Sequence, residues 1–288
     1  MKTIKYFFEA IIIYISFFFI FLIGLKVSRI IFSYIFNKIG PIFKSQDTIN
    51  SNIKQVFGEQ TDDKIKSLVR NMWSNYGKVF VEYIYLGRFK SNDNHIDKKE
   101  KEILNEIKKN NKPVIFISGH FANFELMSME LTKFGINLAT LYRPLNNFFL
   151  NPFMEHLRKK HICPNQIKKG IIGTRKVISF LKEGSSIALM IDQRLSEGKK
   201  VPFFNKNAYT TTLPAQLALK YNCNIVPVSI KRKSNDVFEM EILSPINIIK
   251  KTDEEKNKLE ISLHLNKLLE KMLLNNPGQW IWTHNRWK

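Results

Sequence analysis

A histidine and a glutamate stand directly after a short apolar run in the stretch FISGHFANFEL, residues 116–126. On a continuous helix their spacing would turn the side chains of His120 and Glu125 roughly 140° apart, so they would not meet. If His120 lies in a strand-to-helix loop and Glu125 in the first turn of the next helix, the two can approach. Such a pair is typical of a general base held by a carboxylate, which fixes the tautomer and stabilises the imidazolium. The alternative is a loop histidine beside a solvated glutamate.

Polar residues also follow two other apolar runs. Tyr142 and Arg143 come after one of them, and Asp192 and Gln193 come after another. In open α/β sheets, reactive groups collect just beyond the carboxyl ends of the strands. The pattern therefore predicts that these residues and His120 lie along one edge of a sheet.

Several familiar catalytic motifs are missing from the sequence. It contains no GxSxG elbow, no P-loop and no Rossmann glycine fingerprint. A His–Glu pair without a protein nucleophile suits direct attack by a substrate hydroxyl on an activated acyl group. The sequence thus favours chemistry without a covalent acyl-enzyme and without a cofactor.

Alternating helices and strands must position these residues. Short apolar runs predict strands at 114–118, 137–142, 186–192, 225–232 and 237–243. Helical spacing of apolar residues predicts helices within 50–90 and at about 122–134, 148–160, 174–183, 213–222 and 253–275. A polar stretch at 90–102 predicts a loop before another short helix. Strands that alternate with helices indicate an α/β fold with helices on the faces of a sheet.

The N-terminus predicts a membrane anchor. Residues 6–25, YFFEAIIIYISFFFIFLIGL, are twenty residues with a single charge at Glu9, about the length that crosses a bilayer core. The heavier basic flank follows the segment, which favours a main domain in the cytoplasm. A basic amphipathic stretch continues from Lys26 without a small-residue cleavage site, so we expect a retained anchor instead of a signal peptide. Because of Glu9, a helix that lies in the interface is an alternative to one that spans. The predicted division is 1–45 for the anchor and its extension, and 46–288 for the main domain.

The net charge limits the kinds of binding partner, and the cysteines and histidines bear on disulfides and metal sites. Lys and Arg outnumber Asp and Glu by 45 to 25, a net charge of +20, which attracts nucleic acid, an acidic lipid surface or an acidic carrier protein. The basic residues are dispersed and form no recognised nucleic-acid-binding module, so we expect no nucleic-acid partner. Cys163 and Cys223 indicate no disulfide framework. His156 and His161 lack a third ligand at a usual spacing, so we expect no metal site.

Several ordered stretches together resemble the late acyltransferases of lipid A biosynthesis, the lauroyl and myristoyl transferases. The resemblance covers most of the chain, and GHFANFE corresponds to the family's H-x-x-x-x-D/E motif. The other matching stretches are the N-terminal anchor, YRPLNN, KKGIIGTRKVISFLKEG, MIDQR, VPFFNKNAYTTTLPAQLAL and GQWIWTHNRWK.

The resemblance implies a mixed sheet flanked by helices, of the glycerolipid-acyltransferase kind. It also implies transfer of an acyl chain from an acyl carrier protein thioester to a hydroxyl of an anionic glycolipid, the lipid A precursor, at the bacterial inner membrane. His120 would be the base and Glu125 its partner. Arg143 would contact a substrate phosphate or the developing oxyanion, or else form a surface salt bridge.

Other residues receive weaker roles from the resemblance. Asp192 and Gln193 match the family's Asp-Gln pair and would shape the site, while Arg175 would meet phosphates or belong to a solvated helix face. The chain departs from the family at Arg194, where an acidic residue is usual, and at Asn205, where glycine is frequent. It also has Asn285 and Arg286 in place of the usual basic pair. We expect Trp280 and Trp282 to cap the sheet or the core, with an interfacial position as the alternative.

Two other functions compete with this interpretation. One keeps the chemistry and changes the acceptor to a glycerolipid or another glycolipid. The other is a non-enzymatic, membrane-tethered nucleic-acid-binding protein, which would explain the charge but not the ordered matches.

Overall fold

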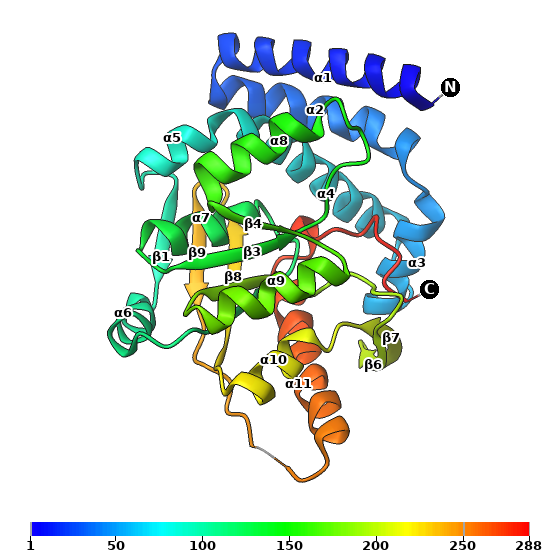
Figure 1. Cartoon of the computed structure of the whole chain (residues 1–288). Coiled ribbons are helices and arrows are strands. Elements are labelled where there is room, and N and C mark those ends of the chain that lie inside the picture. The colour runs from blue at the N-terminus through cyan, green and yellow to red at the C-terminus, as the bar shows by residue number, and fades with distance from the viewer. Residues whose placement is uncertain (1, 250, 288) are drawn as a thin grey trace.

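The computed structural model describes residues 2–249 and 251–287. A mixed sheet lies at its centre, with helices on both faces and two long N-terminal helices across one end (Figure 1). The α-helices are α1 (Lys2–Ile23), α2 (Leu25–Phe43), α3 (Gln46–Phe57), α4 (Asp62–Glu82), α5 (Leu86–Ser91), α6 (Lys101–Asn110), α7 (Glu125–Lys133), α8 (Asn151–Leu157), α9 (Ile171–Lys182), α10 (Leu213–Tyr221) and α11 (Glu254–Asn275). Short helical turns are η1 (Tyr83–Tyr85), η2 (Arg158–Ile162) and η3 (Pro277–Gln279).

The strands form one seven-stranded sheet and one hairpin. They are β1 (Ile96–Lys99), β2 (Ile115–Ser118), β3 (Leu138–Tyr142), β4 (Asn165–Lys168), β5 (Ser186–Met190), β6 (Lys199–Phe203), β7 (Lys206–Thr210), β8 (Ile225–Arg232) and β9 (Phe238–Ile242). The large sheet has the order β1-β9-β8-β2-β5-β3-β4, and every pairing in it is parallel except β8 with β9. The predicted mixed sheet with flanking helices is therefore confirmed, and β2 and β5 lie side by side at its centre.

Period-two alternation along β2 explains why both faces of the sheet are covered. Ile115 and Ile117 belong to the apolar core shared with α9, α10 and α11, while Phe116 belongs to the core on the α7 side. All three side chains are fully buried. A strand buried on both faces reads as a continuous apolar run, which is typical of parallel strands.

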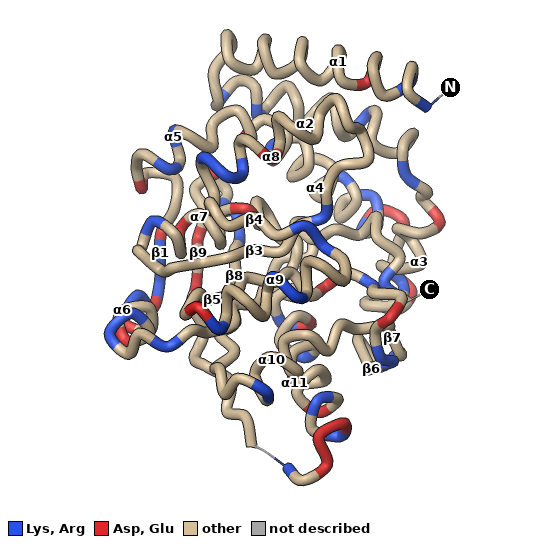
Figure 2. The backbone as a smooth tube through the Cα atoms, viewed as in Figure 1, with Lys and Arg blue, Asp and Glu red and all other residues tan. Residues whose placement is uncertain are grey.

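Helices α1 and α2 pack as a hairpin over one end of the molecule (Figure 1). Gly24, with φ of +89°, separates them in a conformation that a side chain disfavours. Helix α2 lies so close against α4 at Gly77 that an added Cβ would meet the Phe32 carbonyl oxygen at 2.2 Å. Gly40 likewise lies on the indole of Trp73. Figure 2 shows α1 almost free of charged residues, which accords with the predicted anchor.

The sequence missed four of the strands. β1 and β4 lie at the two edges of the large sheet and are polar, so they carry no apolar run. The hairpin β6–β7 turns through Phe204 and Asn205, which both have positive φ, where the usual turn signal would be glycine. The strands and helices predicted from apolar patterning are confirmed to within a few residues at each end.

Candidate active site

His120 and Asp192 meet beyond the carboxyl ends of the paired strands β2 and β5. The Nδ1 atom of His120 lies 2.7 Å from Oδ1 of Asp192, and the backbone N–H of His120 donates to Oδ2 at 2.8 Å. Since a carboxylate only accepts, Nδ1 carries the ring proton and Nε2 keeps its lone pair. In the described residues no protein group hydrogen-bonds to Nε2. The imidazole is 18% exposed, so it can be reached from solvent.

The loop between β2 and α7 gives His120 this position. A Cβ at Gly119 would come within 2.6 Å of the Phe121 ring and 3.2 Å of Asp192, so only glycine fits there. Ala122 takes a positive φ of 47°, and its N–H donates to the backbone oxygen of Gln279. The Phe124 ring lies edge-on to the imidazole at 4.6 Å. The loop is thus held by packing on both sides of the histidine.

Asp192 is a buried anion with three donors. Besides the two from His120, the indole Nε1 of Trp280 donates to Oδ2 at 2.8 Å, and Asp192 is fully buried. Burial alone raises the pKa of this carboxyl, but the charge of His120 and these hydrogen bonds outweigh it and hold the pKa below the usual value. The carboxylate is therefore ionised at neutral pH and can stabilise an imidazolium.

The expected contact between Glu125 and His120 is not formed. Glu125 begins α7 and accepts from the Tyr83 hydroxyl at 2.7 Å and from Arg158 Nε at 2.8 Å. A second guanidinium nitrogen of Arg158 lies 2.8 Å from the same carboxylate oxygen. Both oxygens of Asp192 face His120, so the nearby aspartate takes the place predicted for Glu125. Burial lowers the pKa of Arg158 by itself, but the charge of Glu125 outweighs it and raises that pKa.

A buried ionic cluster lies behind the same loop. Glu82, at the end of α4, is fully buried and pairs with Arg29 of α2 at 2.7 Å and with Arg232 of β8. Asn123, from the loop itself, donates to Glu82 at 2.9 Å. Burial raises the pKa of Glu82, but the charges of the two arginines outweigh it and lower that pKa. The cluster ties α2, α4, the sheet and the His120 loop together.

The segment after α11 closes the site from the other side. Trp280 and Trp282 are buried, as predicted for residues that cap the core. His284 accepts from the backbone N–H of Arg194 at 2.8 Å through Nε2, so that nitrogen is unprotonated. Burial, together with nearby positive charges that include Arg286, lowers the pKa of His284. Arg286 is fully buried and donates to Tyr209 and Thr210 of the hairpin.

The remaining predicted residues are Arg143, Gln193 and Arg175, and the structure places them as follows. Arg143 directly follows β3, which is the neighbour of β5, and its side chain is exposed. Gln193 follows Asp192 and is partly buried. Arg175 lies on α9 and is exposed. In the described residues none of these three side chains hydrogen-bonds to His120 or Asp192.

Two contacts of the site could not be found by spacing. Arg158 lies within the basic run RKKH, which reads as a solvated face, and Tyr83 lies within a helical stretch. Trp280 is expected from the sequence to cap the sheet or the core, but spacing does not predict its bond to Asp192, 88 residues away. Only the polar end of each predicted strand gave a signal, and that signal correctly placed His120 and Asp192 together.

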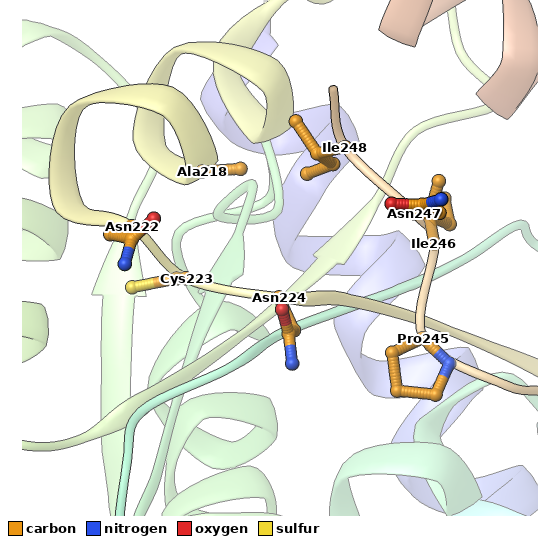
Figure 3. A pocket seen from close by; sticks show the side chains of 8 residues that line it. All are labelled: Ala218, Asn222, Cys223, Asn224, Pro245, Ile246, Asn247 and Ile248. Atoms are coloured by element: carbon orange, nitrogen blue, oxygen red, sulfur yellow. The ribbon is translucent and has the colours of Figure 1, made fainter. Parts of the chain in front are cut away.

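A cavity lies at the other end of the central strands, before the amino end of β8. This cavity of about 310 Å³ is bordered by Asn222, Cys223 and Asn224, just before β8, and by residues 245–248 (Figure 3). Cys223 is buried and free, and burial raises the pKa of its thiol. A protonated buried thiol is a poor nucleophile. Cys223 is therefore not an activated nucleophile.

Comparisons with known proteins identify the class of protein to which this fold and this candidate site belong. Residues 2–288 match the family "Bacterial lipid A biosynthesis acyltransferase". The chain is 23% identical over 257 residues to the lipid A biosynthesis palmitoleoyltransferase of Escherichia coli K12, covering 86% of this chain and 80% of that one. It is equally similar, with the same coverage, to a lipid A biosynthesis acyltransferase of Shigella flexneri.

The chain therefore belongs to the bacterial lipid A biosynthesis acyltransferases. It is an enzyme that transfers acyl groups in lipid A synthesis, and the resemblance found in the sequence is confirmed. The non-enzymatic alternative is set aside.

Proposed function

We propose that this enzyme moves a fatty acyl chain from an acyl carrier protein thioester to a hydroxyl of a lipid A precursor, without an acyl-enzyme. His120 acts as the general base. The observation that carries the proposal is the His120–Asp192 pair, in which Nδ1 is engaged at 2.7 Å and Nε2 is left for a substrate proton. The family membership supports the acyl acceptor and the reaction class.

The proton and the electron pairs balance in two steps. Nε2 of His120 takes the proton of the acceptor hydroxyl as its oxygen attacks the thioester carbonyl, and Asp192 stabilises the imidazolium that forms. The tetrahedral intermediate then collapses, the carbon–sulfur bond breaks, and the imidazolium returns the proton to the leaving thiolate. The products are the acylated lipid and the free thiol of the carrier.

The other predicted residues take supporting roles in this proposal. Glu125 acts through its buried pair with Arg158, which fixes the start of α7 and so the loop that ends there. Arg143 meets a substrate phosphate or the oxyanion, because it follows the strand next to β5 and is exposed. Gln193 shapes the site beside Asp192, and Arg175 meets phosphate on the exposed face of α9.

The charge of +20 supports two anionic partners, the acidic carrier protein and the glycolipid. Residues 1–45 form the membrane-binding part and residues 46–288 the acyltransferase domain, on the cytoplasmic side of the inner membrane. The basic residues that follow α1 support this location, because the cytoplasmic leaflet is anionic and attracts basic segments.

The test is acyl transfer by membranes that contain the protein, with acyl carrier protein thioesters and a tetra-acylated lipid A precursor, read by mass spectrometry. We expect product with the wild type and a loss of roughly a hundredfold or more with His120→Ala. Transfer that survives this change would remove His120 as the base. Intact-protein mass spectrometry after incubation with the donor alone should show no added acyl mass, and a stable adduct would refute direct transfer.

The donor and the acceptor each have an alternative. Matched coenzyme A thioesters in the same assay decide the donor, since we expect faster transfer from the carrier protein. If the lipid A precursor is not acylated, the acceptor is another glycolipid or a glycerolipid. Lipid analysis of a deletion strain would identify it by the species that is lost.

A further inference from the structure

Helix α1 is attached to the rest of the chain along most of its length. Hydrogen bonds near its start, its middle and its end join it to other segments. In order along the helix these are Asn147 Nδ2 to Tyr6 O at 2.8 Å, Tyr14 OH to Phe149 O at 3.0 Å, and Tyr85 OH to Ile20 O at 2.9 Å. The attached length from residue 6 to residue 20 is about 21 Å at the usual rise per residue. The helix therefore lies along the domain and does not project from it (Figure 1).

Aromatic packing follows the same line. Tyr6 and Phe7 contact Phe148 and Phe149 edge-on, at centroid distances of 6.0 and 5.6 Å. Nearer the end of α1, Phe17 stacks on Phe80 of α4 at 5.0 Å. These contacts bury Phe17 to 6% exposure. The attachment is thus apolar as well as hydrogen-bonded, and it involves one side of the helix.

The opposite side of α1 is an exposed apolar stripe. Its residues recur every three or four positions, and each is more than half exposed: Ile4, Phe8, Ile12, Ile15, Phe19 and Leu22. Phe18 and Phe21 widen this surface on one side and are 59% and 70% exposed. An exposed apolar area of this length marks a membrane or protein contact. Lys2, Lys26 and Lys38 are exposed at the ends of α1 and within α2. This arrangement of an apolar stripe with basic flanks fits the surface of an anionic bilayer.

A membrane-crossing α1 conflicts with what is attached to it. If α1 stood along the bilayer normal, the segment 143–150, which is irregular and mostly exposed, would lie at hydrocarbon depth. Irregular backbone exposed to lipid is not tolerated there, because its polar groups have no partners. Glu155 and Asn151 of α8, which follow directly, would be submerged too. A helix parallel to the bilayer surface places the stripe in lipid and these groups toward the domain.

We propose that α1 lies in the plane of the membrane interface, with its apolar stripe in the acyl-chain boundary of an anionic bilayer, and does not cross. Both ends of α1 are then on the same side of the membrane as the catalytic domain. A spanning helix would place residue 2 on the opposite side. The two arrangements therefore differ in which compartment contains the N-terminus.

Thiol labelling with a membrane-impermeant maleimide decides between them. Lys2→Cys marks the start of α1, and Lys109→Cys marks α6, whose exposed side chain lies in the domain. Each variant of the full chain is labelled in intact spheroplasts, in inverted membrane vesicles and after solubilisation in detergent. The unsubstituted chain gives the background, because Cys163 and Cys223 are both buried.

We expect both cysteines to be labelled in the same one of the two membrane preparations. In that preparation each should be labelled at least about tenfold more than in the other preparation. Labelling in opposite preparations would overturn the proposal and show that α1 crosses. The comparison holds whichever side the domain faces, so it does not depend on the proposed cytoplasmic location.

Discussion

Oδ1 of Asp192 accepts the ring proton of His120, and Oδ2 of the same carboxylate accepts the backbone N–H of that histidine. A single aspartate thus fixes both the position and the tautomer of the imidazole. Trp280 donates to Oδ2 as well, so this oxygen is held by two donors while Oδ1 faces only the ring. Because the two oxygens have different partners, an asparagine at position 192 would be held in one orientation of its side-chain amide.

Replacing Asp192 by asparagine keeps the shape of the side chain but should prevent His120 from acting as a base. The two N–H donors at the Oδ2 position select the amide oxygen there, which leaves the amide nitrogen facing Nδ1. That nitrogen donates to Nδ1 and drives the ring proton to Nε2, where the lone pair is needed. We expect the turnover number to fall roughly a hundredfold or more, measured by acyl transfer at saturating substrates. Asp62→Asn, at an exposed position on α4, is the control and should keep full activity.

A double-mutant cycle separates Asp192 from Glu125 as the partner of His120. In the His120→Ala background, Asp192→Asn should add little further loss, because the two residues act as one unit. Glu125→Gln should lower stability in both backgrounds, because it leaves Arg158 buried without its carboxylate. Transfer rates and thermal unfolding of the unsubstituted chain, Asp192→Asn and Glu125→Gln, each with and without His120→Ala, check this. Full additivity of His120→Ala with Asp192→Asn would contradict the pairing.

The stability of the enzyme should depend on pH through His284. The pKa of His284 in the folded chain is below its ordinary value of 6.5, so below pH 6.5 the unfolded chain binds more protons than the folded one. Its contribution to stability is therefore present above pH 6.5 and is lost as the pH falls through the folded pKa. His284→Asn keeps an acceptor for the Arg194 N–H and should flatten the decline of the melting temperature as the pH falls below about 6.5.

His161 also has a lowered pKa and contributes in the same direction, so the variant should reduce the pH dependence without abolishing it. An unchanged slope in His284→Asn would show that the Arg194–His284 contact does not form in solution. The measurement is a series of thermal unfolding curves in detergent at constant ionic strength.

Gly77→Ala tests the packing of α2 on α4. The added Cβ would meet the Phe32 carbonyl oxygen at 2.2 Å, and backbone cannot move away as a flexible side chain can. We expect a loss of about 1–3 kcal/mol in the free energy of unfolding. Ser67→Ala, at an exposed position of the same helix, should leave stability unchanged or slightly raised. Equal stability of the two variants would mean that α2 is not docked on α4.

The sequence predicted the centre of the sheet and missed its edges for one physical reason. β2, β5 and β8 are buried on both faces, so their residues form apolar runs that stand out. β1 and β4 are stabilised by pairing with a neighbour and not by burial of their own side chains, and their composition matches that of a loop. The long apolar N-terminal helix was equally evident, because its length and hydropathy are read directly from the sequence.

The site was predicted in part, because strand ends are local features and carboxylate partners are not. His120 and Asp192 each follow an apolar run, so their meeting at one edge followed from sheet geometry. The choice of Glu125 as the partner rested on its closeness in sequence, and the burial of Arg158 beside it could not be inferred from the chain. The pairing of Glu125 with Arg158 and of Asp192 with His120 depends on contacts 33 and 72 residues apart.

The bond from Trp280 to Asp192 has a consequence for the order in which the enzyme is made. Ribosomes deliver the chain from its N-terminus, so Asp192 is synthesised 88 residues before the indole that holds it. The backbone oxygen of Gln279, which holds the His120 loop at Ala122, arrives equally late. Helix α1, His120 and Asp192 are therefore already made while these two contacts are still missing. The contacts made by residues 279 to 284 complete this centre last, so we expect a chain that stalls before them to lack activity.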